Sequence, residues 1–518
     1  MSMQACRGAF GRDMSTSLWS HLGGPERAAV LGRPDDQRLA HELATLLQRQ
    51  FISSGCQSGE LIGTLPDIRR RYGLGRWACR EAVGILEMRG WLKLRRGAGG
   101  GLILTLPTIQ HLAKLMLVHL CLKGARVEQV IEARRVVHRI VVRKLTTPDG
   151  VPPAVSELPP QRSLALDSRM QSQGFSRWLA ARTGNPVLSF LMEFVTTLYD
   201  ECADTVAVAR VAQQEQLWDA IRGGDESGAS AALEDFLEGT ERLQRGEKVG
   251  LPRMFPRDGS GTSATYAVWL AQRLMREIAQ RVHFGRMDLG NEAEIAERHH
   301  LNRDIVRRAV RMLEDIGVVV SRRGANGGLT TREPDLAAVV ELIPQMLWQR
   351  NISSSELCEA LFFLKLEAAR LAAVRVHRGL ASDEAVGLAE QLLHTAPTQR
   401  HELIMMENSL LDLAENDVLA ACDRGMLFYA PVLPAEFTDP AGPQATRAIA
   451  NNLKILEAIR AGDVPRTEAA YMQQVLGILS DGAPAFLTDG APVFHATRPP
   501  RVADPIRASI SEPRLTRG

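Results

Sequence analysis

Between residues 269 and 283, apolar side chains recur every fourth position, which is the spacing of the buried face of an amphipathic helix. These side chains are Leu270, Leu274, Ile278 and Val282. A second helix is predicted to begin after Asn291, because Glu294 follows three residues later as in a capping box, and to end near Arg298. After a short turn, Asn302 is a suitable cap for a third helix.

The third helix is predicted to be amphipathic, with Arg303 and Arg307 four residues apart on its polar face. Its apolar face consists of Val306, Ala309, Val310 and Leu313. A β-prone run, 318–321, comes next, and a glycine-rich turn and a second apolar run follow it. The turn is basic and contains Arg322, Arg323 and Gly324. Three short helices and a hairpin predict a winged helix-turn-helix.

The same pattern occurs earlier in the chain at a constant offset, the one that separates Arg76 from Arg303. Arg80 matches Arg307 at this offset. The basic turn of the first copy contains Arg95, Arg96 and Gly97, which match Arg322, Arg323 and Gly324. Further matches at the same offset are Cys79, Ala82, Val83, Leu86, Glu87 and Gly90 with Val306, Ala309, Val310, Leu313, Glu314 and Gly317. The caps expected here are Thr64 with Asp67 for the second helix, and Gly75 for the third.

The repeat continues behind each predicted wing, where the offset grows through insertions. Asn185 returns as Asn416, each followed two residues later by Val-Leu. An Ala-Ile-Arg-x-Gly-Asp stretch occurs at 220–225 and again at 458–463. We therefore expect one unit of a winged helix and an all-helical part to occur twice.

This organisation predicts a mainly α fold, with two winged helix-turn-helix domains (three helices and a small β-hairpin wing), each followed by an all-α helical bundle. The expected segments are a disordered N-terminal segment 1–33, winged helix 34–106, helical domain 107–245, linker 246–264, winged helix 265–333, helical domain 334–480 and a poorly ordered tail 481–518.

Composition narrows the class of protein. The chain is 45% hydrophobic and 24% charged with a formal net charge of +2, so any affinity for nucleic acid must come from local basic clusters. Seven dispersed cysteines are typical of reduced thiols, and we expect a cytoplasmic protein. No apolar run reaches the roughly 18–20 residues that span a bilayer, so no membrane partner is expected.

The arginines of the third helices lie at the helix N-termini, where residues that read bases in the major groove are found. Arginine can make two hydrogen bonds to guanine there, and basic wing tips can approach phosphates or a minor groove. We therefore expect a double-stranded DNA operator as partner. The candidate DNA-binding residues are Thr64, Arg76, Arg80, Arg95, Arg96, Gly97, Asn291, Asn302, Arg303, Arg307, Arg322, Arg323 and Gly324.

The stretch 289–314 resembles the GntR family of bacterial transcription regulators. The parts behind the wings resemble the helical FCD effector domain of its FadR-like subfamily, on the residues Phe175 and Gly184-Asn185-Pro186 and the two Ala-Ile-Arg-x-Gly-Asp stretches. The resemblance implies a DNA-binding regulator, with repression as the commoner mode. Members of this family usually carry one unit per chain and dimerise. Two units in one chain therefore imply an intramolecular pseudo-dimer or a four-headed homodimer.

The two copies differ where bases would be read. Trp77 and Ala78 of the first copy correspond in the repeat to Asp304 and Ile305 of the second. The two heads are therefore expected to prefer different half-sites. Copy one also has Gly75 where the family prefers Ser or Thr.

Many FCD domains bind a divalent metal through one Asp and three His. The matching positions here are Ser172, Ser176, Gln214, Phe236, Leu403, Glu407, Asn452 and Gln474. None is histidine, so we expect no metal and no cofactor. The resemblance leaves open a small carboxylic acid or an acyl-CoA as effector, or a helical part that serves only as a scaffold.

Two other functions compete with this interpretation. Winged helices also dock other proteins or support ligand binding without contacting DNA. An enzyme is disfavoured because the chain has no nucleophile elbow, zinc motif or dinucleotide fingerprint.

Overall fold

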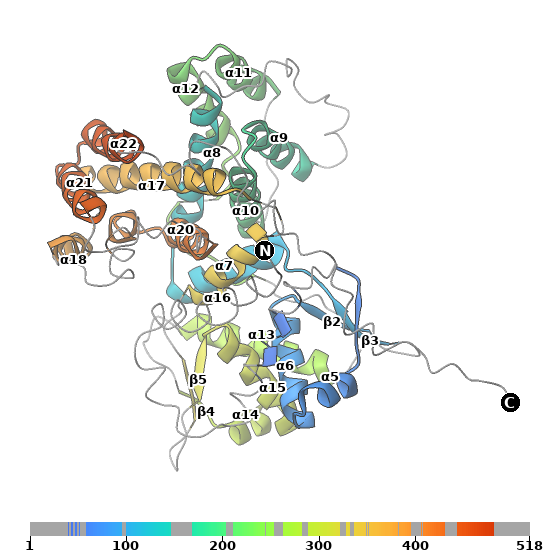
Figure 1. The fold of residues 1–518 in the computed structure, drawn as a ribbon. Helices are drawn as coiled ribbons and strands as arrows, with labels where there is room; N and C mark the ends of the chain where they lie inside the picture. The colour runs from blue at the N-terminus through green and yellow to red at the C-terminus, as the bar shows by residue number, and fades with distance from the viewer. Residues whose placement is uncertain are drawn as a thin grey trace, which may run out of the picture. The chain divides into compact units, whose positions relative to one another are not determined.

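A computed structural model gives the fold of the chain (Figure 1). It describes residues 40, 43–44, 47–48, 51, 58–95, 100–146, 168–203, 211–243, 245–252, 263–281, 288–321, 328–331, 336–348, 350, 352–381, 383–394, 406, 408–429 and 443–480. The predicted N-terminal segment, most of the predicted linker and the predicted tail lie outside these residues.

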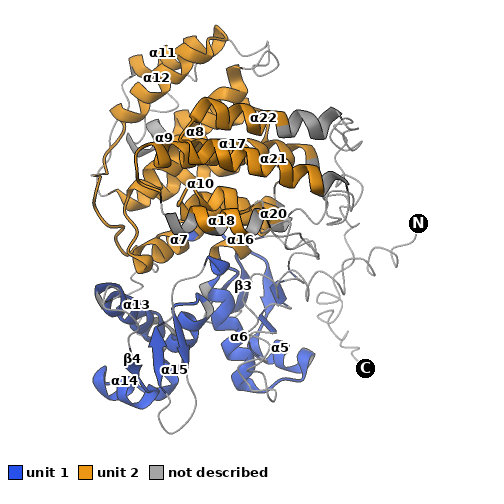
Figure 2. Ribbon diagram, turned by 90° about the vertical axis from the view of Figure 1, so that its left-hand side faces the viewer, with its two compact units in different colours: residues 1–111, 253–338, 495–518 blue, residues 112–252, 339–494 orange. Residues whose placement is uncertain are grey.

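The chain divides into two compact units, which Figure 2 colours separately. Unit 1 comprises Met1–His111, Arg253–Ala338 and His495–Gly518, and unit 2 comprises Leu112–Pro252 and Val339–Phe494. Both predicted winged-helix regions therefore fall in unit 1, and most of both predicted helical regions falls in unit 2. The described residues form a mainly helical fold with two small antiparallel sheets, which is compatible with winged helix-turn-helix and helical domains.

From β1 and from β4 onward, unit 1 shows the same order of elements twice. The first set is β1 (Leu61–Gly63), α5 (Leu65–Tyr72), α6 (Arg76–Met88), β2 (Leu92–Arg95) and β3 (Gly101–Leu104). The second set is α13 (Ser263–Arg281), β4 (Asp288–Gly290), α14 (Glu292–Arg298), α15 (Arg303–Asp315), β5 (Val319–Ser321) and β6 (Leu329–Thr331). The strand orders are β1-β3-β2 and β4-β6-β5, so the predicted hairpins are each joined by a third strand.

Two features of unit 1 differ from the sequence prediction. Strands β1 and β4 were not predicted, because three residues are too few for an alternating pattern to show. Helix α13 begins at Ser263, before the predicted start at 269. Its first turns bury Ala267 and Ala271, whose small side chains do not register as an apolar stripe.

Helices α6 and α15 end in the same way, at a glycine that the repeat preserves. Gly90 has φ 76° and Gly317 has φ 75°, a left-handed conformation that favours glycine. Just before them, Glu87 Oε1 accepts a hydrogen bond from the Leu94 backbone N–H at 3.0 Å, and Glu314 Oε1 accepts one from Ser321 N–H at 3.2 Å. These matched contacts attach the first strand of each hairpin to the helix before it.

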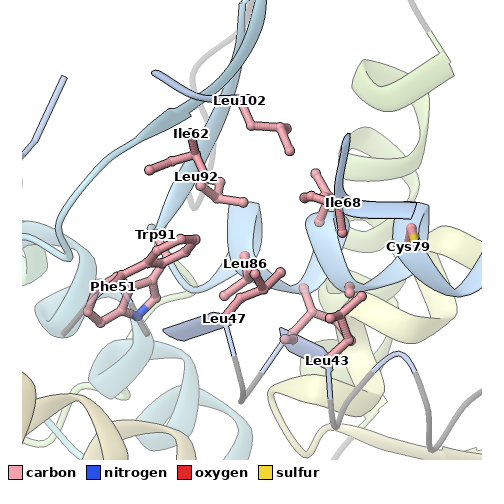
Figure 3. Close-up of a cluster of buried hydrophobic side chains, with 14 of the residues drawn as sticks. Leu43, Leu47, Phe51, Ile62, Ile68, Cys79, Leu86, Trp91, Leu92 and Leu102 are labelled. Atoms are coloured by element: carbon pink, nitrogen blue, oxygen red, sulfur yellow. The ribbon is translucent and has the colours of Figure 1, made fainter. Parts of the chain in front are cut away.

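The core of the first winged-helix region is formed around α6 (Figure 3). Leu43, Leu47 and Phe51 lie four residues apart and pack with Leu86 and Trp91. The rings of Phe51 and Trp91 are 6.3 Å apart between centroids. Removing this much apolar surface from water is the main stabilising contribution to such a small domain.

Within the part of the chain that the structure describes, unit 2 is built of helices, with one isolated β-bridge between Arg126 and Lys248. The first half contributes α7 (Ile109–Lys123), α8 (Glu128–Thr146), α9 (Ser168–Arg182), α10 (Pro186–Cys202), α11 (Val211–Arg222) and α12 (Glu226–Gly239). The second half contributes α16 (Ala337–Trp348), α17 (Ser354–His377), α18 (Asp383–His394), α20 (Asp417–Tyr429), α21 (Pro443–Arg460) and α22 (Val464–Ser480). Helix α8 packs against α10 and α12, and α17 packs against α21 and α22. Among the described residues, every helix is too short or too polar to cross a lipid bilayer.

Contacts between the two halves of unit 2 are reciprocal. Asn185 caps α10, and its Nδ2 donates to Glu356 O at 2.9 Å and Glu359 Oε2 at 2.8 Å. Asn416 precedes α20, and its Nδ2 donates to Gln129 O at 2.9 Å and Glu132 Oε2 at 3.2 Å. The acceptors are matching residues of the repeat in each case, so each half makes the same contact to the other.

Leu86→Ala is expected to lower the free energy of unfolding of unit 1 by roughly 2–5 kcal/mol, because Leu86 is fully buried and truncation leaves a cavity. Leu94→Ala is the matched control, since Leu94 is 46% exposed and should cost less than about 0.5 kcal/mol. Denaturant unfolding of both variants measures the difference. Equal losses would contradict the assignment of Leu86 to the core.

Candidate nucleic-acid interface

Helix α15 begins as the sequence predicts, and its cap fixes where the arginines lie. The Asn302 side chain accepts a hydrogen bond from the Asp304 backbone N–H at 2.9 Å. Arg303 follows and is exposed. Arg307, one turn later, is partly buried, and its Nε donates to Glu292 Oε2 at 3.2 Å. Within the described part of the chain, Arg303 has no ion-pair partner, so its guanidinium is available to a ligand.

Helix α6 presents its arginines more openly. Gly75 is the N-cap and offers no side-chain acceptor, as its residue type predicts. Arg76 and Arg80 are exposed, and neither pairs with any residue that the structure describes. Leu65 occupies the position that matches Glu292 in the repeat, so Arg80 has no carboxylate like the one that holds Arg307. The two helices therefore carry equivalent arginines in different electrostatic settings.

The preceding helices are capped by the residues that the sequence singled out. Asn291 accepts from Ala293 N–H at 2.9 Å and Glu294 N–H at 3.0 Å, and Glu294 Oε2 accepts from Asn291 N–H at 3.0 Å. In the first set, Asp67 Oδ2 accepts from the Thr64 backbone N–H at 2.8 Å and from its hydroxyl at 2.5 Å. These hydrogen bonds hold the pKa of Asp67 below its ordinary value.

Only the base of the first predicted wing tip falls within the described residues. Arg95 ends β2 and is exposed. Arg96, Gly97, Arg322, Arg323 and Gly324 lie outside the described residues. Across from Arg95 on β3, a Cβ on Gly101 would come within 2.6 Å of Gly63 O, so glycine there allows β1 to approach β3.

A buried carboxylate that no sequence pattern singled out lies between α6 and α15. Glu81 is 5% exposed, and its Oε1 lies 3.6 Å from Arg311 Nε. The Arg311 guanidinium also lies 5.6 Å from the ring centroid of Trp77. Burial raises the pKa of Glu81 to about 7, although the charge of Arg311 acts in the opposite direction. The sequence carries one sign that Glu81 is unusual, which is that the charge is reversed between the copies. Arg308 occupies the position that matches Glu81 in the second copy.

Several positions in unit 2 match the metal ligands of FCD domains in the sequence. Ser176 and Phe236 both lie beside His138, which is buried and was not among the candidates. His138 Nε2 is 2.8 Å from Ser176 Oγ, and Nδ1 is 2.8 Å from Arg134 O. Since the carbonyl can only accept, Nδ1 donates and Nε2 accepts from the hydroxyl. Burial lowers the pKa of His138 to about 3, so the imidazole is neutral and both nitrogens are engaged.

Gln214 and Asn452 are also described, whereas Leu403 and Glu407 lie outside the described residues. The backbones of Ser172 and Gln474 belong to α9 and α22. Within the described part of the chain, no group of three or more His, Cys, Asp or Glu side chains could hold a metal ion.

Comparison with known proteins gives a distant likeness. No family model and no curated protein matches the chain. Among solved structures, it is similar to Streptococcus agalactiae GntR, with 19% sequence identity, over 42% of this chain and 100% of that chain, at a TM-score of 0.30. A likeness this distant does not establish a family.

Asn302→Ala is expected to destabilise α15 by about 1 kcal/mol, because the Asp304 N–H loses its acceptor. Asn302→Gly should cost only a few tenths of a kcal/mol, since glycine leaves this end accessible to water. Thermal unfolding of the two variants distinguishes these values. If Ala and Gly cost the same, the side-chain cap contributes nothing.

Glu81→Gln is expected to change how stability depends on pH. A pKa raised from 4.5 to about 7 means that the folded state binds an extra proton between these values. Stability from this group is therefore fully present below pH 4.5 and lost as the pH rises through 7. Between about pH 4.5 and pH 8, the free energy of unfolding of the variant should rise by about 3 kcal/mol relative to that of wild type. Denaturant unfolding across this range measures the gain, and parallel curves would contradict it.

Proposed function

We propose that this chain is a sequence-specific DNA-binding regulator of transcription of the GntR type, with two fused winged-helix heads. The observation that supports this most is the start of α6 and α15. Each helix begins at a defined cap, follows a short capped helix and presents arginine to solvent at its first residue, Arg76 or Arg303. A base-reading helix requires this placement, because its N-terminal residues enter the major groove.

The charge distribution agrees with a local contact to DNA. The net charge of +2 provides no general attraction, so affinity depends on these arginines and the predicted basic wings. Arg76, Arg80 and Arg303 can bind DNA without breaking an ion pair to any described residue. Arg307 must first leave Glu292, or bind a base while Glu292 holds its orientation. With Asp304 in place of Trp77, the two heads are expected to read different half-sites.

A docking module for another protein is the alternative, and the same arginines argue against it. An exposed guanidinium contributes little to folding, so three of them at two helix N-termini have no evident structural role in unit 1. Phosphates and guanine edges are partners that use such groups.

The remaining features of the proposal come from the sequence motifs, the cysteine pattern and the resemblance. We propose repression as the mode, no catalytic activity, a cytoplasmic location and helical domains without a metal. A small carboxylic acid or an acyl-CoA stays open as effector, and the buried, fully hydrogen-bonded His138 is consistent with a helical domain that has lost metal ligation.

Selection from a randomised duplex pool tests the proposal. We expect wild type to enrich a motif with two different halves. Arg76→Ala/Arg80→Ala should lose one half and Arg303→Ala/Arg307→Ala the other, at a cost of about 1–3 kcal/mol for each base-reading arginine. Removal of an arginine that contacts phosphate instead should make the negative slope of log K against log salt less steep by about 0.9.

Arg222→Ala/Arg378→Ala is the matched control, because it removes two exposed arginines from unit 2. It should change neither the motif nor the affinity beyond about twofold. No enriched motif for wild type, or equal losses in the control, would overturn the proposal in favour of the docking module.

A further inference from the structure

Charged contacts in both units join the first half of the chain to the second, and they bear on whether one copy or two copies bind DNA. The question rests on the proposed function, which leaves open an intramolecular pseudo-dimer and a homodimer. The contacts between α6 and α15 in unit 1, and between α8 and α17 in unit 2, distinguish the two.

In unit 1, the contact is between Glu81 and Arg311. Their side chains are 5% and 12% exposed, and their nearest atoms, Oε1 and Nε, are 3.6 Å apart. Arg311 Nη1 also lies 3.2 Å from Glu314 Oε2 on its own helix, which orients the guanidinium. Glu81 belongs to the same helix as Arg76 and Arg80, and Arg311 to the same helix as Arg303 and Arg307. The pair thus links the two helices proposed to read DNA.

The matching residues could not make this contact between two identical halves. At the offset of the repeat, Arg308 matches Glu81, and Gly84 matches Arg311. Two first halves would leave Glu81 opposite Gly84, as a buried carboxylate without a partner. Two second halves would bring Arg308 opposite Arg311, as two like charges. Both arrangements are costly, because a buried charge needs a partner of opposite sign.

Unit 2 shows the same relation independently. Arg139 Nη1 of α8 donates to Glu367 Oε2 of α17 at 3.2 Å, and the Glu367 side chain is fully buried. At the same offset, Leu366 matches Arg139, and Ile140 matches Glu367. Glu367 also contacts Arg143 and Arg370, which match each other in the repeat. The contact with Arg139 is the one-sided one, with its cation only in the first half and its anion only in the second.

Other contacts in unit 2 are the same from either side, as expected of a former two-fold interface. Asn185 reaches Glu359 while Asn416 reaches Glu132, and these carboxylates are themselves matching residues. An interface between identical chains contacts itself reciprocally in this way. The two charged pairs are directional instead, because Glu81–Arg311 in unit 1 and Arg139–Glu367 in unit 2 cannot be made with the halves exchanged.

We infer that the two halves of the chain form a heteropair selected by charge, so that a single copy binds one duplex at an asymmetric site whose two different half-sites have one fixed spacing. Buried ion pairs contribute little net stability but strongly disfavour wrong pairings. Because both halves belong to one chain, their pairing is intramolecular and occurs at high effective concentration.

Reversal of the unit 1 pair tests the inference in the full-length protein. The variants are Glu81→Arg, Arg311→Glu and the two combined, with Glu297→Arg as a control that adds the same charge at an exposed position of α14. Light scattering gives the mass of the free protein and of its complex with a selected duplex. Selection from randomised duplexes gives the motif and its spacing, and thermal unfolding reports pairing without DNA.

We expect wild type to have the mass of one chain, to bind one duplex per chain, and to enrich a non-palindromic motif with one spacing. Glu81→Arg should weaken binding to the complete motif by about tenfold or more, while binding to either half alone changes less than about twofold. Glu81→Arg/Arg311→Glu should recover most of the loss in affinity and in Tm, and Glu297→Arg should lose neither.

Two chains per duplex on a palindromic motif would overturn the inference, as would a double variant no better than the worse single variant. Failure of the proposed function looks different, since wild type would then enrich no motif at all. In that case a single-chain mass, and a Tm lowered by Glu81→Arg and restored in the double variant, would still support the heteropair and limit the failure to DNA binding.

Discussion

Backbone N–H groups at the start of a helix have no partner within the helix, and the side chains that accept from them determine much of this structure. Asn302 fixes the first residue of α15 and thereby brings Arg303 to its exposed end. Asn185 and Asn416 accept from the first turns of α10 and α20, and their amide nitrogens donate to the opposite half of unit 2. Asparagine therefore sets helix boundaries, positions the candidate DNA contacts of α15 and joins the two halves of unit 2.

The two halves have the same architecture but different charges. Glu87 and Glu314 make the same hydrogen bond to the strand that follows each helix, so the geometry of helix and wing is preserved. Around this shared frame, Arg80 pairs with no described residue and Arg307 is held by Glu292. A frame that keeps its hydrogen bonds can tolerate changed charges at its surface, because exposed charges contribute little to folding. That tolerance lets one fold present two surfaces of different charge.

The candidate site was predictable where the signal is local. Caps at Asn291, Asn302 and Gly75, and the arginines that follow them, were read from short patterns, because capping depends on residues three or four positions apart. Strands β1 and β4 were missed, since three residues carry no alternation. His138 was also missed, because it joins Ser176 and Phe236 only after α8, α9 and α12 have packed together.

By itself, the sequence determined the order of elements, the repeat at a constant offset, and the helix starts that carry arginine, because periodicity and capping are properties of neighbouring residues. Only the tertiary structure decided that Glu81 meets Arg311 and that Arg139 meets Glu367. The partners in each pair come from opposite halves of the chain, and no local rule relates them. Each of these pairs matters because it is shielded from water. A charge away from water is costly without a partner of opposite sign, and only the fold can supply that partner.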